Sequence, residues 1–303
     1  MTTPSQFTVA VCTRNRAHLL PTVVQSIARQ DFPDRSIDIL IVDNDSTDKT
    51  PRVLQQLSEK FPGVRGAREP RRGIGHARNR AIEEARGEWL VYIDDDAEML
   101  PGYFAALDRV LQEENDIGAV GGPIEVGWLG PVPAWYEPAL DGLFNKLDIA
   151  SYRTTLRYPQ EIYTTNFAAR ASLLSELGGF RADLAAPGSG VTAEAEDAEM
   201  ALRIQTVAGL RILWDPAMRV RHYVQPERLT PAYMIAKAEQ TGRARCRIER
   251  AYPGHGGVSR AWAGLAEWAA RKLAGRTRGP LTERVHLATA MGYLKEWRRP
   301  SAS

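Results

Sequence analysis

The chain has 303 residues, of which 44% are hydrophobic and 25% charged, enough for one large domain or two small ones with substantial cores. No run of eighteen apolar residues predicts a membrane-spanning helix, and the N-terminus lacks the charged and apolar regions of a signal peptide. Two cysteines, Cys12 and Cys246, are too few for a disulfide framework and indicate a reducing, cytoplasmic setting.

The formal net charge of +2 hides an asymmetry along the chain. Residues 226–303 carry 15 lysines and arginines against 6 acidic residues, whereas the rest of the chain carries 24 against 31. The basic charge is therefore concentrated in a C-terminal segment that follows an acidic body.

Strands alternate with helices through the first 115 residues. Hydrophobic periodicity predicts strands over 7–11, 37–42 and 88–93, and helices over 19–27, from 50, over 77–85 and from 101. This alternation favours an α/β fold with a mostly parallel sheet flanked by helices.

From about residue 116 the pattern loosens, and residues 121–138 are interpreted as a shaped loop rich in Gly, Pro and Trp. A helix is expected within 164–180 and another near 196–207, one or two strands over 210–224, and helices after Pro226.

Three polar clusters, "TRNR" from Thr13, "DNDS" from Asp43 and "DDD" from Asp94, follow the three predicted strands. Ligands of parallel sheets bind beyond the carboxyl ends of the strands, so these clusters are the candidate site. In an extended chain Asp94 and Asp96 point to one side, and two carboxylates on one side suit Mg²⁺ or Mn²⁺. The alternative is an acidic turn at a helix start.

The segment "DNDSTDKT" superficially resembles a calcium-binding loop. Its sixth position is Asp48 where an EF-hand has Gly, and its twelfth is Leu54 where an EF-hand has Glu, so that site is excluded. A side chain here can accept a hydrogen bond from a nucleobase, or the segment is a polar turn capped by Ser46 or Thr47.

The segment "GIGHAR" keeps only two glycines of the dinucleotide-binding pattern, and no GxxxxGK[ST] sequence exists, so Rossmann and P-loop sites are disfavoured. Arg78 and Asn79, together with Arg71 or Arg72, are candidates for contacting a nucleotide or the acidic cluster. A solvated basic helix face is the alternative for Arg71 and Arg80.

The segment "AEAEDAEMALR" places Glu196 and Asp197 at a helix start. One reading is a general base that deprotonates an acceptor hydroxyl. The other is favourable placement at the helix dipole with a Glu199–Arg203 pair. His222 lies in a predicted strand, where it is either a metal or diphosphate ligand or an ordinary core or surface histidine.

Six segments together resemble the family 2 glycosyltransferases, which are inverting enzymes with the GT-A fold. The segments are "VAVCTRNR", "ILIVDNDSTD", "GIGHARNRAI", "GEWLVYIDDDAEMLPGYF", "TTNFAARASLLSELGGF" and "EDAEMALRI". They occur in the family's order and cover residues 7 to about 222.

The resemblance implies a role for each matching position. Nucleotide binding falls to Thr13, Arg14, Asn15, Asp43, Asp45, Arg78, Asp94 and Asp95. Gly121, Gly122 and Asn166 border the donor sugar or acceptor, and Asp96 with His222 binds Mn²⁺ or Mg²⁺. Asp197 is the catalytic base, and Glu196 helps to orient the acceptor.

The resemblance also implies a donor and a reaction. A nucleotide-diphosphate sugar, by family habit a UDP-sugar, gives up one sugar to a hydroxyl of a carbohydrate, lipid-linked or small-molecule acceptor. Processive members carry QxxRW, but the nearest string here, Gln240–Ala244, lacks Trp, so we expect one transfer per event.

We expect a GT-A domain over residues 1–225, with its nucleotide-binding half to about 115 and its acceptor-binding half from about 116. A basic helical extension follows over 226–303. Within it, residues 259–278 predict a basic amphipathic helix with tryptophans, which suits the inner face of an anionic membrane. The alternatives are packing on the catalytic body or on a second subunit in a homodimer; nucleic acid is disfavoured because the body is acidic.

Two other function classes fit less well. Phosphoryl transfer by an aspartyl nucleophile requires DxDx[TV], but the fifth position here is Glu98. A non-catalytic nucleotide-sugar-binding protein would not need Asp197.

Overall fold

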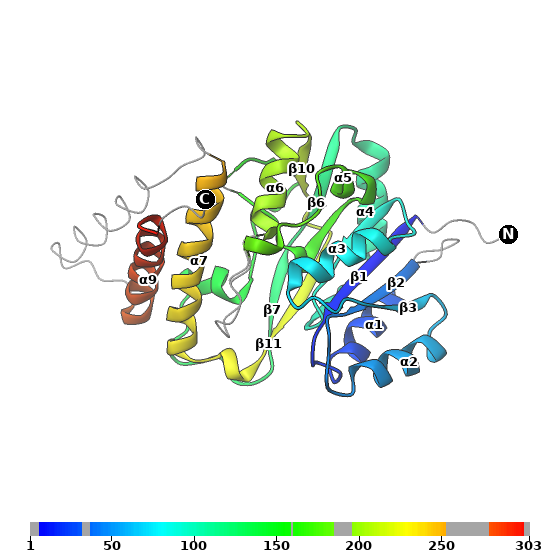
Figure 1. Ribbon diagram of the computed structural model, residues 1–303, viewed down its shortest axis with the longest axis horizontal. Helices are drawn as coiled ribbons and strands as arrows, with labels where there is room; N and C mark the ends of the chain where they lie inside the picture. The colour runs from blue at the N-terminus through cyan, green and yellow to red at the C-terminus, as the bar shows by residue number, and fades with distance from the viewer. Residues whose placement is uncertain (1–5, 32–36, 159, 185–195, 253–278, 300–303) are drawn as a thin grey trace. The chain divides into compact units, whose positions relative to one another are not determined.

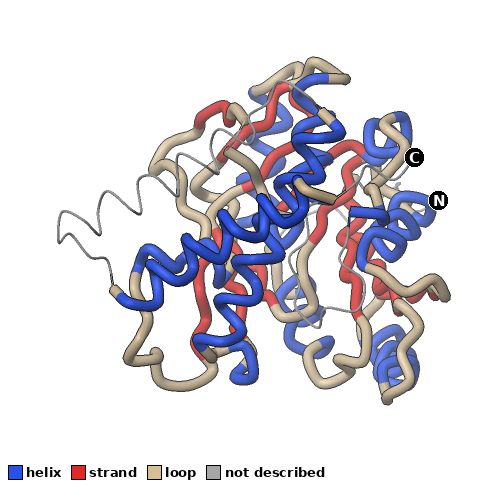
Figure 2. The backbone as a smooth tube through the Cα atoms, turned by 60° about the vertical axis from the view of Figure 1, so that its left-hand side comes forward, coloured by secondary structure: helices blue, strands red, loops and turns tan. Residues whose placement is uncertain are grey.

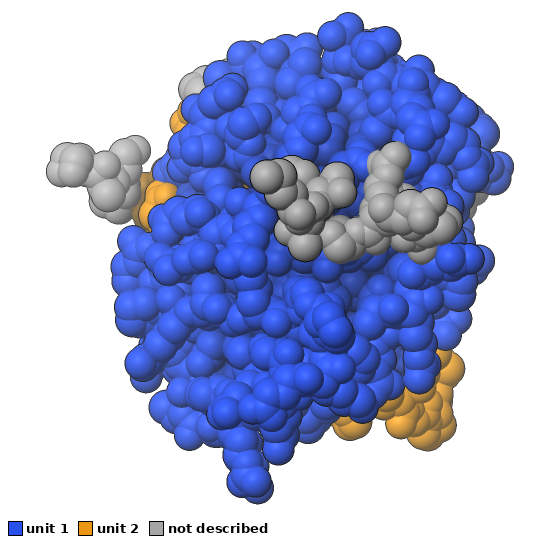
Figure 3. Space-filling model, turned by 90° about the vertical axis from the view of Figure 1, so that its right-hand side faces the viewer, with its two compact units in different colours: residues 1–127, 145–182, 197–223 blue, residues 128–144, 183–196, 224–303 orange. Residues whose placement is uncertain are grey.

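The computed structural model describes residues 6–31, 37–158, 160–184, 196–252 and 279–299. The amphipathic helix expected over 259–278 lies outside the described residues. The chain forms two compact units (Figure 3). Unit 1 comprises Met1–Gly127, Asn145–Ala182 and Asp197–Tyr223, and unit 2 comprises Trp128–Phe144, Asp183–Glu196 and Val224–Ser303.

Unit 1 is organised around an eight-stranded mixed sheet with the strand order β3-β2-β1-β4-β9-β6-β10-β8 (Figure 1). The strands are β1 (Phe7–Thr13), β2 (Ile37–Asp43), β3 (Val64–Arg68), β4 (Trp89–Tyr92), β6 (Ile117–Gly121), β8 (Thr154–Leu156), β9 (Phe167–Arg170) and β10 (Arg211–Trp214). The first four strands in the order are parallel, and β9 is antiparallel to both its neighbours. A separate sheet joins β5 (Ala97–Met99), β11 (Val220–Val224) and β7 (Ile124–Trp128) in the order β5-β11-β7.

Helices cover both faces of the larger sheet (Figure 2). Alternate residues of the buried strands point to opposite faces, so Val9 and Ala10 of β1 belong to different hydrophobic clusters. The first cluster takes in α1 (Leu20–Ala28), α2 (Thr50–Lys60) and α4 (Tyr103–Glu113), and the second takes in α3 (Ile74–Glu84), α5 (Ala171–Glu176) and α6 (Glu196–Thr206).

Six strands were not expected from the sequence: β3, β5, β6, β7, β8 and β9. β3 has the sequence VRGAR, and its charged residues and Gly66 hide an ordinary hydrophobic pattern. β5 follows the acidic cluster directly, and α4 begins only at Tyr103, after Gly102 with φ of 86°. β7 lies within the segment that the sequence analysis interpreted as a loop. A side chain at Gly127 would lie 2.5 Å from the ring of Tyr223, so glycine is needed here for close packing.

Unit 2 contains the helix pair α7 (Pro231–Ala251) and α9 (Pro280–Trp297). A methyl group at Gly242 would overlap the carbonyl oxygen of Thr289, and one at Gly292 would overlap that of Glu239, so the two glycines allow the helices to pack closely. Among the described residues, no helix combines the length and hydrophobicity needed to cross a membrane.

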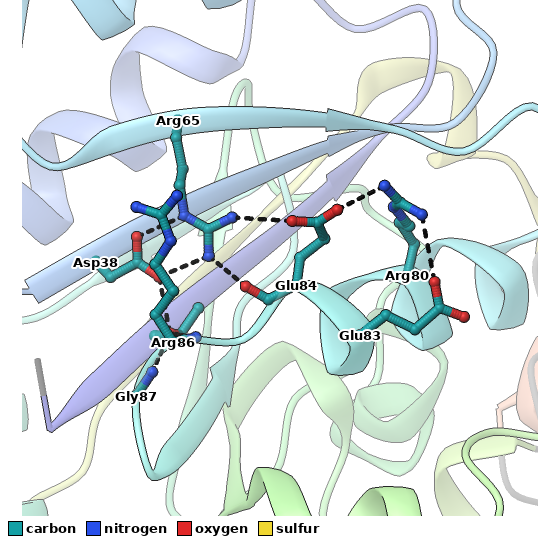
Figure 4. Close-up of polar contacts among 8 residues, drawn as sticks. Asp38, Arg65, Arg80, Glu83, Glu84, Arg86 and Gly87 are labelled. Atoms are coloured by element: carbon teal, nitrogen blue, oxygen red, sulfur yellow. Dashed lines mark hydrogen bonds and ion pairs between the residues drawn. The ribbon is translucent and has the colours of Figure 1, made fainter. Parts of the chain in front are cut away.

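A buried polar network joins the edge of the larger sheet to the connection between α3 and β4 (Figure 4). Asp38 on β2 accepts from Arg65 Nε at 2.7 Å and from the Thr8 hydroxyl at 2.8 Å. The Thr8 hydroxyl accepts from the backbone N–H of Gly87 at 2.8 Å, and Arg65 also donates to the carbonyl of Glu84 at 2.5 Å. One buried carboxylate therefore connects β1, β2, β3 and the turn before β4.

We predict that Asp38→Ala lowers the free energy of unfolding by about 3 kcal/mol, because the guanidinium of Arg65 loses its nearer carboxylate in a site shielded from water and keeps only that of Glu84, at 3.5 Å. Glu83→Ala is the control: it removes the exposed partner of Arg80 and should change stability by less than about 0.5 kcal/mol. Urea denaturation measures both, and equal losses in the two variants would contradict the assigned role of Asp38.

Candidate active site

The site lies where β1, β2 and β4 reach their carboxyl ends. Thr13, the last residue of β1, pairs in register with Asp43, the last residue of β2. β4 runs beside β1 and continues into Asp94–Asp96. The Thr13 hydroxyl donates to Asp95 Oδ2 at 2.7 Å, so the ends of β1 and β4 are joined by a side-chain hydrogen bond.

Asp94, Asp96 and His222 form a potential metal-binding group, with one ligand atom from each residue within 4.8 Å of the others. The small sheet brings them together: β11 is antiparallel to β5 with His222 opposite Ala97, and the Tyr223 N–H donates to the Asp96 carbonyl at 2.7 Å. His222 Nε2 lies 3.3 Å from Asp96 Oδ1. Two carboxylates and an imidazole supply ligands suited to a divalent cation, and the side chains of Asp96 and His222 are only 3% and 4% exposed.

The three adjacent aspartates have different partners. Asp94 accepts from the Thr165 hydroxyl at 2.5 Å. Asp95 accepts from Thr13 through one oxygen and from Arg16 through the other, at 2.7 Å each. Burial raises the pKa of Asp95 to about 6, although the Arg16 charge opposes the rise. Asp95 was expected to bind the nucleotide, and in the structure both its oxygens are bonded within the protein.

Asp197 lies in the first turn of α6 and is almost completely buried. Burial raises the pKa of its carboxyl group, the charge of Arg78 lowers it, and the charge of Asp94 raises it further. The N–H of Ala198 donates to Asp197 Oδ1 at 2.8 Å and fixes the side chain. A carboxyl group with a raised pKa is a stronger base than an exposed one, and this one lies within the electrostatic reach of the candidate metal ligands.

Arg78 of α3 was expected beside the nucleotide, and it is buried with its guanidinium 5.7 Å from the ring centroid of Phe180. The hydroxyl of Tyr92 donates to the backbone carbonyl of Arg78 at 2.8 Å, which ties α3 to β4. The charge of Arg78 therefore acts on Asp197 from a fixed position.

The other expected nucleotide-binding residues surround the ends of β1 and β2. Buried Asp43 accepts from the N–H of Ser46 at 3.0 Å. Asn15, with φ of 54°, accepts from the N–H of Thr47 at 2.7 Å, while Arg14 is exposed. Asp45, with φ of 58°, pairs with Arg72 at 2.9 Å and Arg68 at 3.1 Å, and these bonds lower its pKa.

The residues expected near the donor sugar are tightly packed. Added side-chain atoms at Gly121 would lie 2.6 Å from Ile162, and at Gly122 they would overlap the carbonyl of Met218. Asn166 is 1% exposed and uses its amide internally, accepting from Tyr103 at 3.0 Å and donating to Met218 at 2.7 Å. Glu196 is buried at the first position of α6.

Two residues at this site received no role from the sequence. Arg16 closes the "TRNR" cluster and contacts Asp95 and Asp96, and Thr165 in "TTNF" contacts Asp94. Both are polar residues inside the motifs, but only the fold shows which aspartate each one meets.

Comparison with known proteins identifies the family. The description "Glycosyl transferase family 2" belongs to a family model that matches residues 8–177, more than half of the chain. The chain belongs to glycosyl transferase family 2. A glucosyl-dolichyl phosphate glucuronosyltransferase of Haloferax volcanii is 22% identical over 247 residues, which are 81% of this chain and 78% of the relative.

Solved structures show the same fold. The mannosyltransferase PcManGT from Pyrobaculum calidifontis, in complex with GDP-Man and Mn²⁺, is 22% identical with a TM-score of 0.64 over 97% of this chain and 89% of that one. Residues 1–349 of Staphylococcus aureus TarS, in complex with UDP, give a TM-score of 0.54 at 16% identity over 95% and 89% of the two chains. The protein is thus a glycosyltransferase with the GT-A fold, as its six motifs indicated.

Proposed function

We propose that the protein is an inverting, metal-dependent glycosyltransferase that moves one sugar from a nucleotide-diphosphate sugar to an acceptor hydroxyl. One observation carries this proposal: the grouped ligand atoms of Asp94, Asp96 and His222, with buried Asp197 electrostatically coupled to Asp94. The candidate cation site and the candidate base therefore lie near each other, beyond the carboxyl end of β4.

In the proposed mechanism Asp197 removes the proton from the acceptor hydroxyl as that oxygen attacks the anomeric carbon. The Asp197 carboxylate is oriented by the N–H of Ala198, and the fixed charge of Arg78 stabilises its ionised form. A divalent cation held by Asp94, Asp96 and His222 would offset the negative charge on the departing diphosphate. A single displacement inverts the anomeric centre.

The ligand set favours Mn²⁺ over Mg²⁺, because Mg²⁺ prefers oxygen ligands and His222 offers an imidazole nitrogen. UDP is the proposed nucleotide, bound beside Thr13 and Asp43 at the carboxyl ends of β1 and β2. GDP is the competing choice, since the two similar structures contain UDP and GDP-Man.

The donor can be identified by thermal shift with UDP-, GDP- and dTDP-sugars in the presence of Mn²⁺. A ligand at a hundred times its Kd stabilises the native state by about 2.7 kcal/mol, so the true donor should raise the Tm by several degrees. The Asp96→Ala variant should lose this Mn²⁺-dependent shift. An equal shift with and without Mn²⁺ in the wild-type protein would contradict metal dependence.

Asp197→Asn should lower kcat by about 10²–10⁴-fold and change donor affinity little, since the amide keeps the shape of the base but cannot accept the proton. In the wild-type enzyme, kcat should fall as pH decreases through the Asp197 pKa, which burial places above the ordinary aspartate value. Steady-state kinetics against pH and calorimetry of donor binding test both points. Unchanged turnover in Asp197→Asn would remove the assignment of the base.

We also propose that the catalytic domain ends near residue 225 and that the basic extension over 226–303 contacts an anionic membrane surface, where a lipid-linked acceptor is presented. The charge excess of the extension supports this, as does the dolichyl phosphate substrate named for the Haloferax relative. In vesicle sedimentation, the full chain should pellet with anionic vesicles and stay in the supernatant with zwitterionic vesicles. Equal partitioning would favour packing within the protein or a homodimer.

A further inference from the structure

We propose that Arg16 is the resident counter-ion of the carboxylate cluster, and that it exchanges its bond to Asp96 for the donor diphosphate when the divalent cation binds. The inference rests on the metal-dependent function proposed above. It assigns to one side chain the coupling between metal binding and nucleotide binding.

The two bonds of Arg16 are unequal. Its Nη1 atom lies 2.7 Å from Asp95 Oδ1 and 3.2 Å from Asp96 Oδ2. The side chains of Asp95 and Asp96 are 4% and 3% exposed, whereas that of Arg16 is 32% exposed. The guanidinium therefore covers two buried carboxylates from the solvent side and neutralises charge that would otherwise be costly to bury.

Asp96 is shared between two cationic positions. Its Oδ1 atom faces His222 in the candidate metal group, and its Oδ2 atom faces Arg16. A divalent cation held by Asp96 would repel a guanidinium on the same carboxylate, because charges a few ångströms apart interact strongly at a partly buried site. The longer bond of Arg16 is the one that must break.

Asp95 provides the pivot for this exchange. It is outside the metal group, and the Thr13 hydroxyl fixes its second oxygen at 2.7 Å. The 2.7 Å bond from Arg16 to Asp95 can persist while the rest of the guanidinium turns. A guanidinium has five N–H donors in a planar fork that matches phosphate oxygens, so the released donors suit the diphosphate of the incoming nucleotide.

The test compares the full-length wild-type protein with Arg16→Met. Electron paramagnetic resonance of free Mn²⁺ measures metal affinity without nucleotide, and calorimetry measures UDP and GDP affinity at saturating Mn²⁺. In Arg16→Met, Mn²⁺ should bind about tenfold more tightly because its competitor is gone. The preferred nucleotide should bind about tenfold more weakly because its phosphate contact is lost. If Arg16 had only a structural role, its substitution would weaken both Mn²⁺ binding and nucleotide binding.

Two further variants make the result specific. Arg16→Lys keeps the charge and should show a smaller change in Mn²⁺ affinity than Arg16→Met. Arg29→Met removes an exposed arginine just after the C-terminal end of α1. This variant should match the wild type in both Mn²⁺ affinity and nucleotide affinity.

If the wild type binds Mn²⁺ and Arg16→Met binds it equally or more weakly, the role assigned to Arg16 is wrong, but the proposed metal-dependent function is not affected. Absence of Mn²⁺ binding in the wild type would overturn the metal-dependent function as well.

Discussion

Three carboxylates in a row at the end of a buried strand set the central constraint of this structure. β4 is buried along its whole length, and Asp95 and Asp96 remain buried beyond it, so their mutual repulsion is weakly screened by water. The surrounding chain offsets this repulsion with partners for all three aspartates: Thr165 for Asp94, Thr13 for Asp95, His222 for Asp96, and Arg16 shared between Asp95 and Asp96. The divalent cation of the proposed function would be a further partner for this cluster.

Those partners come from distant parts of the chain, and the sheets bring them to one edge. β9 enters the larger sheet antiparallel between β4 and β6, which places the segment containing Thr165 beside the acidic cluster. The small sheet does the same for His222 through the pairing of β11 with β5. Asn166 fastens this region by bonding Tyr103 on α4 and the carbonyl of Met218. The site therefore depends on the completed fold, although most of its residues lie in the first 100 positions.

Local patterns predicted much of this arrangement. β1, β2 and β4 are short apolar runs that end in polar clusters. Asp94 and Asp96 do lie together in the candidate metal group, but the twofold repeat of a strand is not the reason, because β4 ends at Tyr92 and the chain turns at Asp95 and Asp96, with the N–H of Ala97 donating to the carbonyl of Asp94 at 3.1 Å. β3 and β5 escaped prediction because their residues carry charges or are too few to show a pattern. The assignments of catalytic, nucleotide and sugar contacts remain predictions.

The roles that sequence could not provide are those set by long-range contacts. Arg16 and Arg14 look alike within "TRNR", yet one bonds the acidic cluster and the other is exposed. Asp95 resembles its neighbours in the sequence, and only the positions of Thr13 and Arg16 show that its two oxygens serve to join β1 to β4. Gly121 and Gly122 likewise have a packing role that only the approach of Ile162 and Met218 reveals.

The most direct test of the central claim is a crystal structure of the protein grown with Mn²⁺ and a nucleoside diphosphate, with anomalous scattering used to locate the metal. The account predicts one strong anomalous peak within coordination distance of Asp96, bridging the protein to the diphosphate. An ordered nucleotide with no anomalous peak there, or a peak bound elsewhere on the chain, would contradict it.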